Sequence, residues 1–131
     1  MKTKAEHIQY WIEQSKVDWE VAELLLAGKK YIQSLFFTHL AVEKVCKANW
    51  INANQGNVPP KTHNLIFILS QTPVELNEAQ KVFLLELNRF QIEGRYPEDI
   101  VQLNRICTLE FTVDKIKEAK TLMIWLQSKL P

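Results

Sequence analysis

The chain has 131 residues, about the usual size of one domain, and its formal net charge is +1. Its 47% of hydrophobic residues exclude an intrinsically disordered chain, and a near-neutral charge argues against non-specific binding to the DNA backbone. With only 3 Gly and 5 Pro, long stretches run without a breaker, which favours helices over a many-turned β domain. We therefore expect a single helical domain over residues 1–131.

The first predicted element is a helix from about Lys4 to Ala27. Ile8, Ile12 and Trp19 belong to a series of residues spaced by steps of four and three, which places them on one face. Gly28 follows, and glycine suits the left-handed position at which many helices end.

The second predicted helix runs from about Tyr31 to Ala53 and is apolar on most of its circumference. Leu35, Phe36 and Phe37 fall on three different sides of it. A helix of this kind is usually the central one, with neighbours packed on several sides.

A loop follows, and then a short helix. The stretch from Asn52 to Lys61 contains a glycine and two consecutive prolines, so it is predicted to be irregular. Thr62 can cap a third helix over about His63–Ser70.

Two further helices are predicted in the last part of the chain. Asn77 and Gln80 have the spacing of a capping box and open a fourth helix that runs to about Phe90. The segment Gln91–Phe111 is the least regular and has a β-tolerant end. A final helix is expected over about Thr112–Lys129, with its first residue as the cap. Short connections between such helices predict an all-α antiparallel bundle of about five helices.

Neither the termini nor the cysteines suggest a membrane or metal protein. The N-terminus has no apolar run of the signal-peptide kind, and no window of about 18 uncharged apolar residues occurs. We therefore expect no membrane segment and a cytoplasmic location.

Cys46 and Cys107 form no metal-ligand motif and are expected to be small apolar core residues. No His, Asp or Glu cluster has ligand spacing, so neither a metal nor a cofactor is expected.

Charged residues interrupt the apolar surface of the second helix. Glu43 and Lys47 lie four residues apart in the favourable order for an ion pair, and His39 lies one turn earlier. One interpretation is a partly buried ion pair, with Lys44 extending to water. The other is a functional polar patch, because ionised groups in apolar surroundings are costly unless they are paired. Asp18 borders the apolar face of the first helix. It is either a partner for Lys44, Lys47 or Arg95 or a solvent-facing acid.

Two further places carry residues that suit an anion. His63 stands at the expected start of a helix, where it either satisfies a local carbonyl or helps to bind an anion at the free backbone N–H groups. Arg95 lies in the irregular segment and can hold a phosphate or carboxylate with two hydrogen bonds, and Tyr96 beside it can pack or stack.

The order and spacing of these segments resemble those of the HEPN family (higher eukaryotes and prokaryotes nucleotide-binding). The matching residues are Asp18-Trp19 with Ala22, Gly28 through Tyr31, Phe36 through Ala48, Thr62-His63-Asn64-Leu65 and Arg95-Tyr96-Pro97-Glu98. The resemblance implies a bundle of about five helices, usually a homodimer, and an association with small nucleotidyltransferases, often as toxin–antitoxin pairs.

Some members of that family are metal-independent ribonucleases, and the chain departs from their motif. The motif is an arginine followed after four to six residues by a histidine. Here the arginines are Arg89, Arg95 and Arg105, whereas the last histidine is His63. The usual nuclease assignment therefore fails, and no catalytic residue is assigned.

The expected function is that of a non-catalytic HEPN protein that binds a nucleotide or RNA and a nucleotidyltransferase partner. Two alternatives remain open: a ribonuclease with a displaced site, using His63 as base and Arg95 as phosphate clamp, and a purely structural homodimeric module. The candidate phosphate site is made of Lys44, Lys47, His63, Arg95 and Tyr96, with Asp18, His39 and Glu43 as supporting polar residues.

Overall fold

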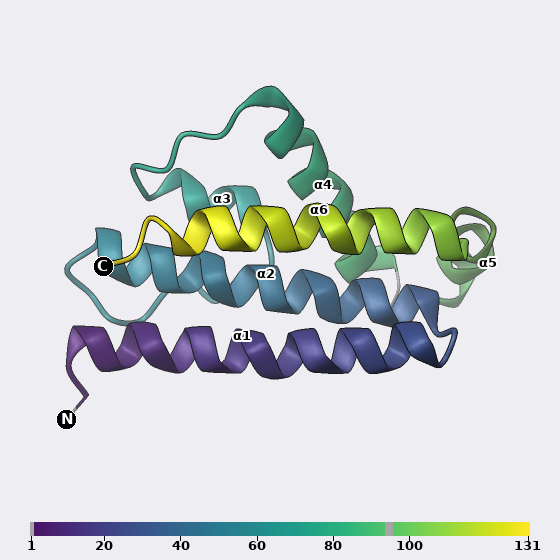
Figure 1. Cartoon of the computed structure of the whole chain (residues 1–131). Coiled ribbons are helices and arrows are strands. Elements are labelled where there is room, and N and C mark those ends of the chain that lie inside the picture. The colour runs from purple at the N-terminus through teal and green to yellow at the C-terminus, as the bar shows by residue number, and fades with distance from the viewer. Residues whose placement is uncertain (1, 94–95) are drawn as a thin grey trace.

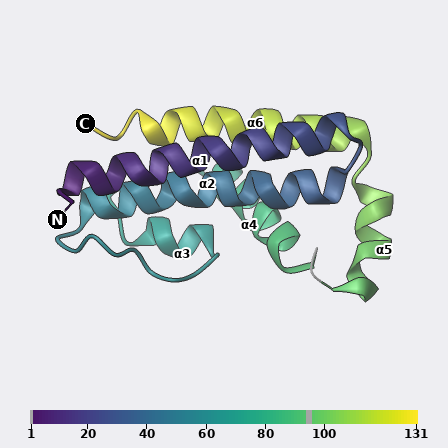
Figure 2. The same ribbon diagram turned by 90° about the horizontal axis from the view of Figure 1, so that it is seen from below.

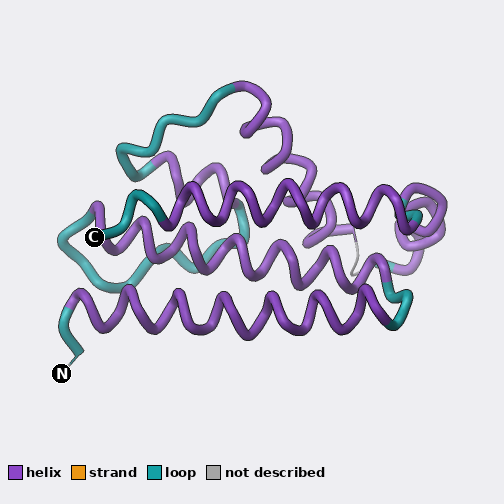
Figure 3. Tube along the Cα trace, viewed as in Figure 1, coloured by secondary structure: helices purple, strands orange, loops and turns teal. Residues whose placement is uncertain are grey.

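The computed structural model describes residues 2–93 and 96–131, and in these residues every regular element is a helix (Figure 3). The predicted all-α bundle is confirmed, and none of the described helices is long and apolar enough to cross a membrane. The helices of the described residues are α1 (Lys4–Ala27), α2 (Tyr31–Ala53), α3 (Leu65–Ser70), α4 (Glu78–Glu93), α5 (Pro97–Ile106) and α6 (Leu109–Gln127).

Helix α2 is the centre of the bundle, as its apolar circumference predicts. It packs against α1, α3, α4, α5 and α6, and most of its side chains are buried. Helices α1 and α6 run beside it, α3 and α4 cover another side, and α5 closes one end (Figures 1 and 2). Helix α6 runs in the same direction as α2, because α3, α4 and α5 bring the chain back to the end where α2 begins (Figure 1).

Helices α1 and α2 form an antiparallel hairpin whose register is fixed by two buried serines. The Ser15 hydroxyl of α1 donates to the carbonyl oxygen of Ala41 at 2.8 Å, and the Ser34 hydroxyl of α2 donates to that of Ala22 at 2.8 Å. Both serines are 0% exposed. Each hydroxyl therefore satisfies its hydrogen-bonding need on the facing helix, which holds the two helices at one alignment.

The turn between these helices differs from the prediction at Gly28. Gly28 has φ −82°, whereas Lys29 has φ 61° and occupies the left-handed position. The amide of Lys30 donates to the carbonyl of Leu25 at 2.8 Å and that of Lys29 to Leu26 at 3.0 Å. These are the two bonds of a Schellman motif, whose left-handed residue stands one position beyond the helix cap.

The third helix begins two residues later than predicted. Asn64 is its N-cap, and its side-chain oxygen accepts from the amide of Phe67 at 3.2 Å. The hydroxyl of Thr62, the predicted cap, accepts from the amide of Asn64 at 3.1 Å and so turns the chain one step before the helix. The prediction of Thr62 as cap was therefore wrong, although a local side-chain cap does start the helix.

The segment predicted to be irregular contains helix α5 and the start of α6. Helix α5 begins at Pro97, carries Glu98 and Asp99 in its first turn and has Arg105 in its last turn, which suits the helix dipole. The cap of α6 is Thr108, four residues before the predicted Thr112. Thr112 instead lies inside α6, and its hydroxyl donates to the carbonyl of Thr108 at 2.8 Å.

Two smaller predictions are confirmed. Asn77 and Gln80 exchange side-chain-to-backbone hydrogen bonds of 2.9 and 2.8 Å, as a capping box requires. Cys46 and Cys107 are free and buried. Burial raises the pKa of both thiols, that of Cys107 to about 11, so neither is a reactive thiolate near neutral pH.

The Lys4 side chain, at the start of α1, binds oxygen atoms at the C-terminal end of α2. Its ammonium donates to the carbonyl oxygens of Ile51, Asn54 and Gly56 at 2.9, 2.8 and 3.2 Å, and to the side-chain oxygen of Asn57 at 2.8 Å. Carbonyl groups at a helix C-terminus lack partners within the helix and carry partial negative charge. One cation therefore satisfies several of these acceptors at once.

Replacing Lys4 by methionine keeps the apolar stem and removes the ammonium that contacts these four oxygens. We expect the free energy of unfolding to fall by about 1–2 kcal/mol, allowing for partial solvation of the ammonium. Urea denaturation of the variant measures this change. Lys16→Met is the control, because Lys16 is exposed on the same helix and the same substitution there should change stability by less than about 0.5 kcal/mol. Equal effects of the two substitutions would contradict the conclusion that the contacts of the Lys4 ammonium stabilise the fold.

Candidate functional site

The candidate site is built around Glu43, a carboxylate buried on the central helix with an exposed fraction of 3%. Its Oε2 atom lies 3.0 Å from Nζ of Lys47, and its Oε1 atom lies 2.8 Å from Nδ1 of His63. Nδ1 of His39 is 3.8 Å from the same Oε1 atom. Each carboxylate oxygen therefore faces a cation or a ring N–H, which offsets the cost of burying the charge.

The short contact with Glu43 decides which nitrogen of His63 is free. A carboxylate only accepts hydrogen bonds, so Nδ1 of His63 carries the proton and donates it to Oε1. In the neutral ring Nε2 then holds the lone pair. The His63 side chain is 52% exposed, whereas that of Glu43 is only 4% exposed. A buried carboxylate thus orients a histidine that reaches solvent, as in acid–base pairs of enzymes.

His39 holds the backbone of His63 in place. The ring of His39 is 0% exposed, and its Nε2 atom donates to the carbonyl oxygen of His63 at 2.9 Å. Burial lowers the pKa of His39, and this outweighs the nearby carboxylate of Glu43, which raises it. His39 is therefore neutral near pH 7 and acts as a fixed donor behind the exposed ring.

Asn88 joins helix α4 to the same segment. Its side-chain oxygen accepts from the amide of Leu65 at 3.2 Å and lies 3.2 Å from Nε2 of His39. Its side-chain nitrogen donates to the side-chain oxygen of Asn64 at 3.2 Å. Residues 63–65 are therefore held from one side by α2 and from the other by α4, and the His63 ring is positioned by both helices.

A second ion pair lies between helices α1 and α2. Nζ of Lys44 is 2.5 Å from Oδ2 of Asp18, and the two side chains are 22% and 11% exposed. The ammonium of Lys47 also lies 5.3 Å from the centre of the Trp11 ring, so α1 supplies an aromatic face to that cation. Both lysines of the predicted phosphate site thus have a carboxylate partner within the chain.

The structure brings part of the predicted set together. Lys47 and His63 meet at Glu43, with His39 behind them, whereas Lys44 forms its separate pair with Asp18. Tyr96 is the N-cap residue of α5, and the residue is 51% exposed. Arg95 lies outside the described residues. These contacts do not test whether the set binds phosphate, which stays a prediction.

A hollow of about 240 Å³ opens beside His63. It lies between the segment that leads into α3 and one face of α4. Two of its residues, Asn88 and Gln91, were not predicted from the sequence, although both interrupt the apolar stripe of α4 at helical spacing from Leu84. The lining residues are Thr62, His63, Asn64, Asn88, Gln91 and Ile92.

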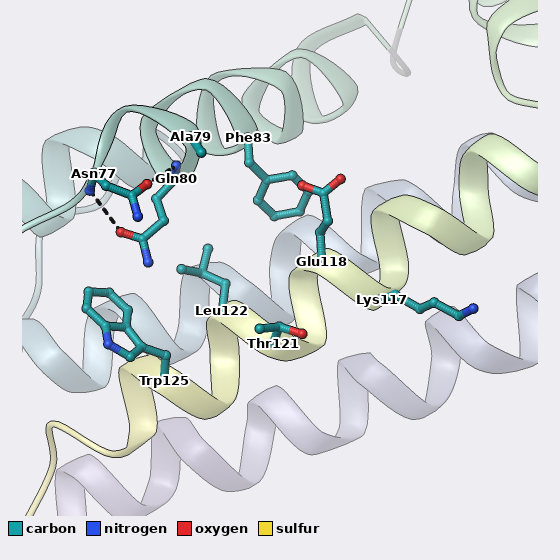
Figure 4. A pocket seen from close by; sticks show the side chains of 9 residues that line it. All are labelled: Asn77, Ala79, Gln80, Phe83, Lys117, Glu118, Thr121, Leu122 and Trp125. Atoms are coloured by element: carbon teal, nitrogen blue, oxygen red, sulfur yellow. Dashed lines mark hydrogen bonds between the residues drawn. The ribbon is translucent and has the colours of Figure 1, made fainter.

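Another hollow, of about 470 Å³, lies between the start of α4 and helix α6 (Figure 4). Its walls are largely apolar, with Phe83, Leu122 and Trp125 directed into it, and Asn77 and Gln80 bind each other at its edge (Figure 4). None of the described residues that line it carries a buried polar atom without a partner. It therefore offers mainly apolar contact.

The comparison with protein families agrees with this helical architecture. The model of the HEPN domain family matches residues 8–129, nearly the whole chain. The chain therefore belongs to the HEPN family. Neither the comparison with curated proteins nor that with solved structures found a match.

Proposed function

We propose that the protein binds a nucleotide or RNA, without cleaving it, at the hollow beside His63. The observation that carries this proposal is the half-exposed His63 ring, fixed by Glu43 at 2.8 Å and bordering a hollow lined with amide and hydroxyl side chains. Its free Nε2 accepts a hydrogen bond from a hydroxyl or base N–H, and its protonated form attracts a phosphate. Membership of the HEPN family supports a nucleotide- or RNA-related role.

Calorimetric titration with ATP, GTP and a short RNA tests this proposal. The wild-type protein should bind at least one of the three, and His63→Ala should weaken that binding about tenfold or more, since it removes a hydrogen bond that involves a charged or polar partner. His7→Ala is the matched control, because His7 lies on α1, in the first two turns of that helix. No binding by the folded wild-type protein, or equal binding by His63→Ala, would refute the proposal.

A second candidate function is a metal-independent ribonuclease, favoured by the carboxylate–histidine pair itself. Nε2 of His63 would take the proton of a ribose 2′-hydroxyl, whose oxygen attacks the adjacent phosphorus, while the 5′-oxygen leaves and takes a proton from water. The products would be a 2′,3′-cyclic phosphate and a 5′-hydroxyl end. Cleavage of RNA in EDTA that is lost in both His63→Ala and Glu43→Gln supports this function. RNA that stays intact with the wild-type protein rules it out.

We propose as partners a second copy of the chain and a nucleotidyltransferase, with the latter as the other member of a toxin–antitoxin pair. This part rests on the properties implied by the family resemblance. Light scattering of the purified protein tests the homodimer, and co-purification with a nucleotidyltransferase encoded nearby tests the heteromeric complex. A dimer that binds no nucleotide and no RNA would favour the purely structural module instead.

A further inference from the structure

The side chain of Gln91 stands out because it is buried and unpaired. Gln91 is 2% exposed, and neither its side-chain oxygen nor its side-chain nitrogen has a hydrogen-bond partner among the described residues. A buried amide without partners is costly, and such groups are rare in native proteins. Gln91 is also one of the residues that line the hollow beside His63. Its amide is therefore an unpaired donor and acceptor buried beside the proposed binding site.

The side-chain oxygens of the other two amides of the hollow are already occupied. The oxygen of Asn64 accepts from the amide of Phe67 and from the side chain of Asn88. The oxygen of Asn88 accepts from the amide of Leu65 and faces Nε2 of His39, and its nitrogen donates to Asn64. Among the described amide side chains that line the hollow, Gln91 is thus the one whose nitrogen and oxygen both lack a hydrogen-bond partner.

We infer that Gln91 binds the edge of a nucleobase that carries a hydrogen-bond donor next to an acceptor. This inference rests on the proposed function and names the part of the ligand that the hollow takes. A glutamine amide matches such an edge with two parallel bonds, as with the N6 and N7 atoms of adenine. His63, on the rim, is then left for the sugar or phosphate of the same ligand.

The size of the hollow agrees with a base. Clefts that enclose drug-sized ligands measure roughly 300–1,000 Å³, and this one measures about 240 Å³. It therefore suits one ring system, while the rest of the ligand stays outside. The lining residues include Ile92, which is 60% exposed and offers an apolar surface for the nucleobase. Each amide atom of Gln91 exposes less than 1 Å². The side chain must therefore turn into the hollow to meet the base.

The first test changes the ligand and keeps the protein intact. Calorimetry with the wild-type protein compares adenosine monophosphate with two analogues, one without the 6-amino group and one with carbon in place of N7. If Gln91 reads this edge, each analogue should bind roughly 5- to 150-fold more weakly. Equal binding of all three nucleotides would overturn this inference and leave the proposed function standing. Absence of binding to any nucleotide or RNA would overturn both.

The second test changes Gln91 to leucine, which keeps the size and removes the amide. The variant should melt at a higher temperature than the wild type, because a buried unpaired amide is gone, and should lose the preference for the 6-amino group. Gln33→Leu is the control, since Gln33 is exposed on α2, and it should retain the preference. A Gln91→Leu variant that is folded and still prefers the complete adenine edge would contradict the inference.

Discussion

Replacing Glu43 by alanine is expected to lower the free energy of unfolding by about 3–5 kcal/mol, the usual cost of breaking a buried ion pair from one side. The substitution leaves Lys47, whose side chain is 10% exposed, without its carboxylate partner. It also removes the acceptor that orients Nδ1 of His63. Both losses act on the folded state, so urea denaturation should show a lower midpoint for the variant.

The control for Glu43 is a glutamate in an exposed ion pair. Glu78 lies 3.6 Å from Lys81 on α4, and its side chain is 89% exposed. Glu78→Ala should change stability by less than about 1 kcal/mol, because solvent screens the pair. If Glu43→Ala and Glu78→Ala had the same small effect, the buried carboxylate would not be holding the site together.

The second large effect expected is a loss of stability in mild acid, caused by His39. Burial lowers the pKa of His39 below its usual value of 6.5. Below pH 6.5 the unfolded chain therefore binds a proton that the folded protein does not bind at this ring. The stabilising contribution of neutral His39 to the free energy of unfolding is fully present above pH 6.5. It is lost as the pH drops from there toward the pKa of His39 in the folded protein, by at most about 1.4 kcal/mol for each pH unit.

Denaturation curves measured between pH 7.5 and pH 5 check this expectation. His39→Gln removes the titrating ring and keeps a side-chain N–H that can reach the carbonyl of His63. This variant should be less stable than the wild type at pH 7 and should show a smaller slope with pH. His63→Gln is the comparison, because it removes a histidine that is half exposed. An unchanged slope in His39→Gln would show that other groups cause the acid sensitivity.

The long helices were predictable because their signals are local. The bounds of α1 and α2 follow from apolar spacing and from the breaker at residue 28, and both were predicted correctly. Helix α5 was missed, although Pro97, Glu98 and Arg105 occupy favourable terminal positions. The helix has only ten residues, and a β-tolerant stretch follows it. The choice between Thr62 and Asn64 as the cap of α3 depends on Asn88, a contact that the local sequence does not reveal.

The site was predictable only where its residues share one helix. The pairing of Glu43 with Lys47 follows from their spacing of four residues, and the structure contains it. The contact between Glu43 and His63 spans 20 residues and requires knowledge of how the loop after α2 returns. Gln91 was missed because a single polar residue on an apolar helix face is usually satisfied within the fold. Its lack of a partner is visible only in three dimensions.

The two serine bonds of the hairpin also have a mechanical consequence. The hydroxyl of Ser15 on α1 bonds to α2, and the hydroxyl of Ser34 on α2 bonds to α1. Sliding one helix along the other by a turn of about 5.4 Å would break both bonds at once. The hairpin should therefore behave as one rigid unit. Because α2 also carries Glu43, α1 and the carboxylate of the candidate site keep a fixed position relative to each other.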